Sequence, residues 1–145
     1  RIAVFMDGRI VQVGTPREVF ARLQARAVAG FIGTPPMNLL DGAWQGGVVT
    51  VLGHALPVAA DSAAARDVTL GVRPGDVRIV ERGLPAHVER IEDLGDSSIV
   101  SFLAAGKLVK LKSDRPPALR EGDDVALGFA PGAAHLFDRS TGVRL

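Results

Sequence analysis

Short apolar runs recur along most of this chain, and Gly, Pro, Asp or Ser separates most of them. Each run is rich in β-branched residues, and together they are GVVTVL (47–52), DVTLGV (67–72), DVRIV (76–80), AHVERI (86–91), SSIVSFL (97–103), KLVKLK (107–112) and DVALGF (124–129). Many short strands at close spacing, without intervening helices, are typical of a small barrel or sandwich. The sequence therefore predicts a mainly β domain, with the Ala-rich stretch AADSAAAR (59–66) as one of its loops.

A different pattern occupies the first 33 residues. The runs IAVFM (2–6) and RIVQV (9–13) flank Asp7-Gly8, a pair that favours the two-residue type I′ turn of a β-hairpin. No polar segment precedes this hairpin and Arg1 opens it directly, so we expect the chain to be a part of a longer protein.

Helix signals follow the hairpin. Thr15, Pro16 and Glu18 have the spacing of a capping box with proline in the first helical position, which predicts a helix that runs to about Leu23. A second helical segment, ARAVAGFI (25–32), should end at the glycine that follows it, before two prolines.

The stretch FIGTPPMNLL (31–40) joins these two parts. It contains two adjacent prolines and no charged residue. A flexible linker would instead be polar and rich in Gly and Ser. We therefore expect a packed joint, in which five apolar side chains lie between the N-terminal part and the β domain: Phe31, Ile32, Met37, Leu39 and Leu40.

Composition limits the classes of function. Apolar residues make up 47% and charged residues 23%, as in ordinary globular proteins, and the net charge of +1 provides no strong field toward nucleic acid or anionic lipid. The chain has six Phe, one Trp and no Tyr, so it offers few aromatic platforms for single-stranded nucleic acid. The absence of Cys excludes disulfides and thiolate metal sites.

The histidines of the chain show no metal-binding pattern. His87 and Glu89 have the spacing that places both on one face of a strand, but two ligands are too few for a catalytic zinc. Another histidine opens HLFD (135–138), where Leu136 and Phe137 are expected to alternate between inside and outside. We predict structural roles for these residues and no metal site.

A serine hydrolase is the next alternative. LGDSS (94–98) carries Ser97 and Ser98, but it lies between two strand runs and reads as a hairpin turn. A nucleophilic serine needs a base within hydrogen-bond reach and an oxyanion hole, usually at a strand-to-helix turn. An esterase around these serines therefore stays a third hypothesis, which a generic ester assay tests.

Two charged groups are candidate contact sites. Arg73, in GVRPGDV (71–77), has the chemistry to bind a phosphate or a sugar hydroxyl, or to brace its own turn and pair with Asp76. An acidic patch follows further along the chain, where it forms a solvated hairpin edge or a regulatory contact: Glu89, Glu92, Asp93 and Asp96.

Several segments of the chain, taken in order, resemble the ATP-binding subunits of carbohydrate-importing ABC transporters of the maltose-importer type. RIAVFMDGRIVQVGTPREVFARL (1–23) resembles the last hairpin and helix of their nucleotide-binding domain, and AVAGFIGTPPMNLL (27–40) is similar to the joint that follows it. Three later segments look like landmarks of their C-terminal regulatory domain: LGVRPGDV (70–77), VERIEDLGDSSIVSF (88–102) and APGAAHLFDRSTGVRL (130–145). Family members usually have Glu where this chain has Gly75, so any role of that carboxylate does not carry over.

The resemblance implies a mainly β fold with two parts. Residues 1–33 would be the last hairpin and helices of an α/β ATPase domain, and residues 34–145 an OB-like β-barrel regulatory domain. The chain has no GxxxxGK[ST] loop, LSGGQ signature, Walker B acidic pair or switch histidine. We therefore expect no catalytic, cofactor-binding or metal-binding residue in it, whereas the parent protein would use ATP and magnesium.

The implied function is to regulate and dimerise an importer ATPase at the cytoplasmic face of the bacterial inner membrane. The implied partners are a second copy, the transmembrane permease subunits and a cytoplasmic regulator, with no nucleic acid. Arg73, Glu92, Asp93 and Asp96 are the expected regulatory or dimer contacts. Two uncharged runs, 47–52 and 97–103, are also expected to leave strand edges unprotected and so to favour self-association.

An alternative hypothesis is that the chain is a barrel module that binds a small ligand, such as an oxyanion or a sugar. Related transporter tails bind oxyanions such as molybdate. Titration with molybdate, sugar phosphates and free sugars separates this function from dimerisation.

Overall fold

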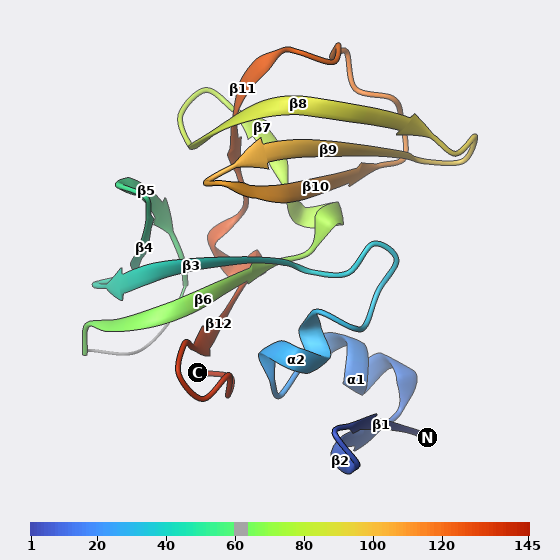
Figure 1. The fold of residues 1–145 in the computed structure, drawn as a ribbon, viewed down its shortest axis with the longest axis vertical. Coiled ribbons are helices and arrows are strands. Elements are labelled where there is room, and N and C mark those ends of the chain that lie inside the picture. Colours follow the sequence, from blue (N-terminus) through green and yellow to red (C-terminus); the bar gives the residue numbers. More distant parts are fainter. Residues whose placement is uncertain (60–63) are drawn as a thin grey trace.

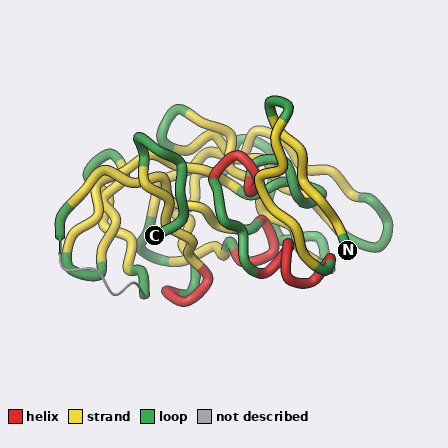
Figure 2. Tube along the Cα trace, turned by 90° about the horizontal axis from the view of Figure 1, so that it is seen from below, coloured by secondary structure: helices red, strands yellow, loops and turns green. Residues whose placement is uncertain are grey.

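The computed structural model describes residues 1–59 and 64–145, and strands dominate it (Figures 1 and 2). The strands are β1 (Ile2–Met6), β2 (Arg9–Gly14), β3 (Asn38–Gln45), β4 (Val48–Val51), β5 (His54–Pro57), β6 (Arg66–Val72), β7 (Arg78–Val80), β8 (Leu84–Asp93), β9 (Ser98–Ala104), β10 (Lys107–Ser113), β11 (Asp124–Gly128) and β12 (Ala134–Asp138). The helices α1 (Pro16–Ala21) and α2 (Arg26–Ala29) are short, as are the 3-10 turns η1 (Pro74–Asp76) and η2 (Pro131–Ala133). The predicted mainly β chain, with an N-terminal hairpin and two short helices, is confirmed.

Two antiparallel sheets build the β region. One has the strand order β10-β9-β8-β11-β7 and the other the order β12-β6-β3-β4-β5. Figure 1 shows the first sheet above the second, with the helices below both. None of the helices within residues 1–59 and 64–145 is long and apolar enough to cross a membrane.

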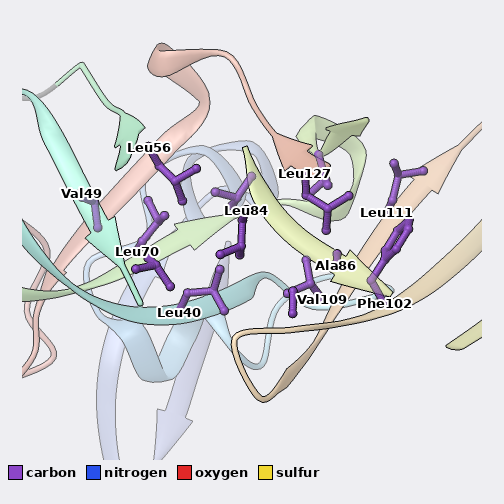
Figure 3. Packing of buried hydrophobic residues seen from close by; sticks show 14 of the residues in the cluster. Leu40, Val49, Leu56, Leu70, Leu84, Ala86, Phe102, Val109, Leu111 and Leu127 are labelled. Atoms are coloured by element: carbon purple, nitrogen blue, oxygen red, sulfur yellow. The ribbon is translucent and has the colours of Figure 1, made fainter. Parts of the chain in front are cut away.

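Apolar side chains from both sheets meet in one main core (Figure 3). Alternation along each strand selects these inward residues. They include Leu40, Val49 and Leu70 from the second sheet, and Leu84, Phe102, Val109 and Leu127 from the first. Burial of this apolar surface is the main force that holds the two sheets together.

A side-chain bridge also ties the sheets together. The buried amide of Asn38, on β3, donates from Nδ2 to the backbone oxygen of Lys110 at 2.8 Å and accepts from the Lys110 backbone nitrogen at 2.7 Å. Lys110 lies on β10, the last strand of the other sheet. The amide thus takes the place of a strand partner at this edge.

The two uncharged runs lie on central strands, so the expectation of unprotected edges there is wrong. β4 lies between β3 and β5, and β9 lies between β8 and β10. These runs lack charge because both of their edges are paired. Within the Ala-rich stretch 59–66, expected to be a loop, residues 60–63 lie outside the described residues and Arg66 already begins β6.

The hairpin and the first helix form as the sequence predicts. Asp7 and Gly8 have φ values of 49° and 74°, and two consecutive positive φ values are what a type I′ turn requires. The Thr15 hydroxyl accepts from the backbone of Glu18, and the Glu18 carboxylate accepts from the Thr15 backbone, which completes the capping box. The helix ends at Ala21, slightly before the predicted end, and α2 is also shorter than expected.

The apolar joint is packed, with one exception. Met37 lies in a second buried cluster with the helices, Ile32 and Leu39 pack against that cluster, and Leu40 lies in the main core. Phe31, in contrast, is 70% exposed, so its predicted burial is wrong. Ile32 follows the end of α2, and its backbone N–H donates to the Val28 backbone oxygen at 2.9 Å. This turn directs Ile32 toward the cluster and leaves Phe31 outside it.

Candidate functional site

The second buried cluster is the contact between the N-terminal part and the β region. It contains side chains from β1, α1, α2 and the segment between the helices, together with Met37 and Phe137: Val4, Val19, Leu23, Val28 and Ala29. Phe137 comes from β12 near the other end of the chain, and none of its side chain is exposed. Its neighbour Leu136 lies in the main core, so the two side chains serve opposite faces of β12, but neither is outside as predicted, because both faces are covered.

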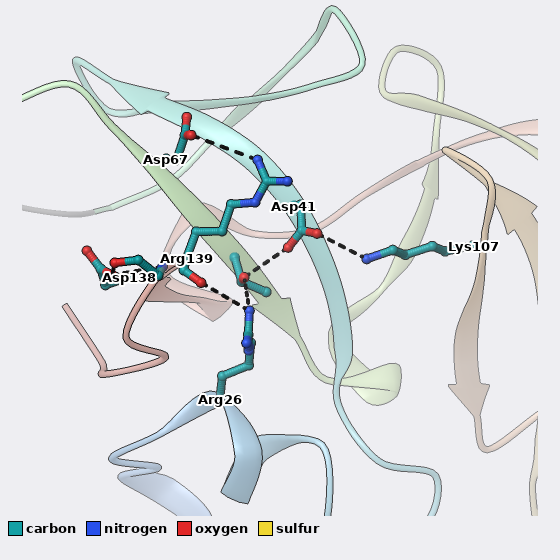
Figure 4. Close-up of polar contacts among 8 residues, drawn as sticks. Arg26, Asp41, Asp67, Lys107, Asp138 and Arg139 are labelled. Atoms are coloured by element: carbon teal, nitrogen blue, oxygen red, sulfur yellow. Dashed lines mark hydrogen bonds and ion pairs between the residues drawn. The ribbon is translucent and has the colours of Figure 1, made fainter.

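A chain of polar contacts crosses this joint (Figure 4). Arg26, on α2, donates from Nη1 to the Thr69 hydroxyl at 3.3 Å and to the backbone oxygen of Arg139 at 3.4 Å. The Thr69 hydroxyl donates to Asp41 Oδ1 at 3.0 Å, and Lys107 Nζ lies 3.4 Å from Asp41 Oδ2. The contacts therefore connect an N-terminal helix, both strands of the β3–β6 pair and β10 in the other sheet.

The electrostatics of Asp41 favour its ionised form. Burial acts to raise the pKa of this carboxyl, but the hydrogen bond from Thr69 and the charge of Lys107 outweigh it, so the pKa is lowered. None of these residues is among the contact sites predicted from the sequence. They are far apart along the chain, and no local spacing signals that the topology brings them together.

The C-terminal residues bind back onto the N-terminal part. The Asp138 carboxylate accepts four hydrogen bonds through Oδ1, two from Ser140 and two from Thr141, which fixes the turn after β12. Beyond the turn, the Arg144 backbone nitrogen donates to the Gln24 oxygen at 3.0 Å, and the Gly142 oxygen accepts from the Arg26 backbone at 2.8 Å. We call residues 138–145 the C-terminal strap.

Arg73, a predicted contact residue, lies at the same joint. Its guanidinium carbon is 3.7 Å from the centroid of the Phe20 ring, and it donates a hydrogen bond to the Phe20 backbone oxygen. Burial lowers the pKa of Arg73, although the charge of Asp76 opposes this. Within residues 1–59 and 64–145, Arg73 makes no ion pair with Asp76, so it braces α1 rather than pairing within its own turn.

The acidic residues lie elsewhere, at the turn between β8 and β9 (Figure 1). Glu92 lies 3.7 Å from Arg90, while Asp93 accepts from the Gly95 backbone at 2.9 Å and Asp96 accepts from Ser97 at 3.0 Å. The structure thus keeps Arg73 apart from this acidic turn. Whether any of these residues contacts a regulator or a second copy stays a prediction.

The histidine candidates do not form a metal site. His87 Nδ1 lies 2.9 Å from Asp124 Oδ1, and this hydrogen bond raises the pKa of His87. His87 and Glu89 are both exposed on either side of the buried Val88, as their spacing predicts. Val88 and Arg90 face consecutive residues of β9, so Glu89 is the extra residue of a bulge and the alternation breaks after it. In the part of the chain that the structure describes, no three His, Asp or Glu side chains gather to hold a metal ion.

His87, the histidine of the β8–β9 hairpin, is not a catalytic partner of the serine candidates. The predicted hairpin turn is present: the Leu94 backbone nitrogen donates to the Ser97 backbone oxygen at 2.8 Å. Ser98 pairs with Asp93 at one end of the β8–β9 ladder, whereas His87 pairs with Leu103 at the other end. This separation places the histidine of the hairpin out of hydrogen-bond reach of either serine.

The β region matches two known domain families. Residues 33–77 match the MalK OB fold domain, and residues 70–137 match the TOBE domain. Residues 33–137 form a MalK-type OB-fold and TOBE region. The predicted OB-like character of the β region is thereby confirmed.

Similar proteins extend the comparison to the whole chain. The sn-glycerol-3-phosphate import ATP-binding protein UgpC of Cereibacter sphaeroides is 38% identical over 149 residues, which cover 100% of this chain and 42% of that protein. The UgpC protein of Jannaschia sp. is 36% identical over 147 residues, which cover 100% of this chain and 42% of that protein. An ABC transporter ATP-binding protein, y4oS, of Sinorhizobium fredii is 36% identical over 152 residues, which cover 100% of this chain and 41% of that protein.

The chain thus spans about two fifths of the length of these relatives. It corresponds to the C-terminal regulatory region of an ABC importer ATP-binding protein of the UgpC/MalK kind. The predicted family is confirmed at this level. The match to the MalK OB fold domain covers residues 33–77, whereas two of these relatives are named for sn-glycerol-3-phosphate, so the maltose-importer type stays a prediction.

Proposed function

We propose that this chain is the regulatory and dimerisation part of the ATP-hydrolysing subunit of a bacterial importer. The parent protein would bind ATP and magnesium, work as a homodimer with transmembrane permease subunits at the cytoplasmic face of the inner membrane, and respond to a cytoplasmic regulator. Its solute would be a carbohydrate-type compound, and the relatives named for sn-glycerol-3-phosphate favour a phosphorylated one.

One observation carries this proposal. A β region that matches both the MalK OB fold and TOBE domains is fixed to the N-terminal helices at several independent points. Phe137 packs in the helix cluster, Arg26 reaches Thr69, Arg73 lies on Phe20, and the C-terminal strap binds the N-terminal part. A joint fixed in this way would transmit movement between an ATPase domain and its regulatory region.

Self-association of the purified chain tests the dimerisation role. We expect a reversible, concentration-dependent dimer through the β region, because a closed two-fold assembly is the commonest arrangement of identical chains. Light scattering across a dilution series measures it. A chain that stays monomeric at the highest concentration contradicts the proposal and leaves ligand binding or docking as the better function.

The exposed hairpin supplies the control for this experiment. Phe5 is 65% exposed on β1, and it could support a contact unrelated to the β region. A Phe5→Ser variant should dimerise like the unmodified chain. Loss of the dimer in this variant would assign the contact to the hairpin instead.

A further inference from the structure

A cleft lies where the two outer strands of the first sheet approach each other. β10 and β7 are the two edge strands in the order of that sheet, and η1, which precedes β7, lies beside β10 (Figure 1). One wall of the cleft runs from Gly75 to Ile79 and the other from Leu111 to Pro117. Its volume of about 550 Å³ lies within the range of small-molecule binding sites.

Positive charge is concentrated in this cleft. Arg78, Lys112 and Arg115 line it, against one carboxylate, that of Asp114. None of the three cations lies within 4.0 Å of a carboxylate in residues 1–59 and 64–145. Because the whole chain carries a net charge of only +1, this excess of positive charge is a local feature.

Much of the hydrogen-bonding capacity of these cations remains available to a ligand. Arg78 uses Nη1 on the backbone oxygens of Gly75 and Val77, which orients its guanidinium in the wall of the cleft. Lys112 Nζ lies 3.4 Å from the Thr34 oxygen and has further donors. The Arg115 side chain makes no hydrogen bond to the residues that the structure describes.

The backbone of β10 adds a donor on the same side. The N–H and C=O groups of Lys110 face Asn38, away from β9. Backbone groups two residues apart in a strand point in the same direction, so the N–H of Lys112 also faces away from β9. It has no strand partner there among the described residues, since β10 is the last strand of its sheet.

Apolar side chains complete the cleft. Val77, Ile79, Leu111 and Pro117 line it beside the cations, and Ile79 is 42% exposed. A carboxylate fits a single guanidinium fork, whereas a phosphate dianion presents three oxygens to several donors at once. We propose that this cleft binds a small phosphomonoester, with the phosphate among Arg78, Lys112 and Arg115 and the carbon skeleton against Ile79 and Pro117.

Calorimetric titration of the full chain at low salt tests this site. The probes are glycerol phosphate, inorganic phosphate, sulfate and glycerol. We expect glycerol phosphate to bind more tightly than inorganic phosphate or sulfate, and glycerol not to bind. Arg115→Ala should weaken glycerol phosphate about tenfold, since it removes one charged donor without removing an internal hydrogen bond.

Matched variants separate the site from general charge. Arg9→Ala makes the same charge change in the N-terminal hairpin and should leave the affinity unchanged, while Lys112→Met should weaken binding as Arg115→Ala does. Thermal unfolding checks that each variant folds. Backbone amide shifts on titration should move in 75–79 and 111–117, a readout that needs no variant.

Several results would overturn the inference. Equal binding by Arg115→Ala and Arg9→Ala would place the ligand elsewhere. Tighter binding of inorganic phosphate or sulfate than of glycerol phosphate would exclude a phosphomonoester as the ligand. A variant in which Glu92, Asp93 and Asp96 are replaced by amides gives a further check. If glycerol phosphate binds only to this variant, the acidic turn of a second copy occupies the cleft in the unmodified chain. The ligand titrations and the Arg115→Ala and Arg9→Ala comparison require neither dimerisation nor an ATPase role, so the proposed function is tested separately.

Discussion

At the scale of single residues, the joint depends on close packing around Gly71. A Cβ atom added at this glycine of β6 would lie 2.6 Å from Met37 Sδ and 3.0 Å from Phe137 Cε2. The absence of a side chain thus allows the aromatic ring and the thioether to cover the strand. Phe137 thus packs between this face of the sheet and the helices that cover it.

Truncation of Phe137 should destabilise the chain strongly. Phe137→Ala removes a fully buried ring and leaves a cavity, so we expect the free energy of unfolding to fall by about 3–5 kcal/mol. Phe31→Ala is the matched control, because Phe31 is 70% exposed, and it should change the free energy by less than about 0.5 kcal/mol. Urea unfolding measures both, and similar losses in the two variants would contradict the assigned packing.

Asp138 makes the C-terminal strap sensitive to acid. Hydrogen bonds from Ser140 and Thr141 lower the pKa of its carboxyl from the ordinary 3.8 to about 2. A carboxyl with a depressed pKa stabilises the folded chain fully above its unfolded pKa, and this contribution is lost as the pH falls toward the folded value.

The Asp138→Asn variant should therefore respond less to acid than the unmodified chain. Its amide oxygen can still accept the turn hydrogen bonds, but it cannot be protonated in this range. We expect the difference in unfolding midpoint between the two proteins to shrink as the pH falls from 3.8 toward about 2. Thermal unfolding at several pH values measures this, and a constant difference would rule out the role assigned to Asp138.

At the scale of elements, the N-terminal hairpin has only partial support. Val4 is buried, and Gln12 donates to the Arg22 oxygen at 2.7 Å and accepts from the Gln24 backbone at 3.2 Å. Other apolar side chains of the hairpin remain exposed: Ile2, Phe5, Ile10 and Val13. A two-stranded sheet by itself is marginal in water, so its stability rests on these few anchors.

Amide exchange should therefore be faster in residues 2–13 than in 98–112. Residues 98–112 belong to a sheet that contributes to the main core, whereas the hairpin of residues 2–13 can unfold locally without exposing that core. Gln12→Ala should accelerate exchange in 2–13 and leave 98–112 unchanged. Equal protection of both ranges in a monomer would mean that the hairpin is an integral part of the β region.

At the scale of the whole molecule, the β3–β6–β12 part of the second sheet lies between two apolar clusters. Leu40 and Leu136 contribute to the main core, while Leu39 and Phe137 contribute to the cluster under the helices. Neighbouring residues of one strand therefore serve different clusters. This arrangement makes the N-terminal part and the β region one packed body, as a coupling role requires.

The 145-residue chain should not hydrolyse ATP. Hydrolysis needs backbone amides and a lysine around the β- and γ-phosphates, and magnesium held by carboxylates. No GxxxxGK[ST] segment supplies that arrangement in this sequence. A phosphate-release assay over a range of ATP concentrations measures it, and saturable hydrolysis by the pure chain would contradict the assignment.

Local chemistry was enough to predict part of this structure. The Asp7-Gly8 turn, the Thr15–Glu18 capping box and the β8–β9 turn each depend on residues adjacent in sequence, so their patterns could be read directly. The succession of apolar β-branched runs likewise predicted a mainly β chain. Such signals act over a few residues and survive without knowledge of the rest of the fold.

Tertiary structure alone decided which faces and edges are covered. The exposure of Phe31, the central positions of β4 and β9, and the double burial of β12 depend on which segments pair across the chain. Likewise, Arg26 meets Thr69, and Arg78 meets Lys112 and Arg115 across one cleft, only because non-local strand pairing brings them together. Sequence spacing carries no record of these pairings, since they arise from the packing of two sheets on shared apolar clusters.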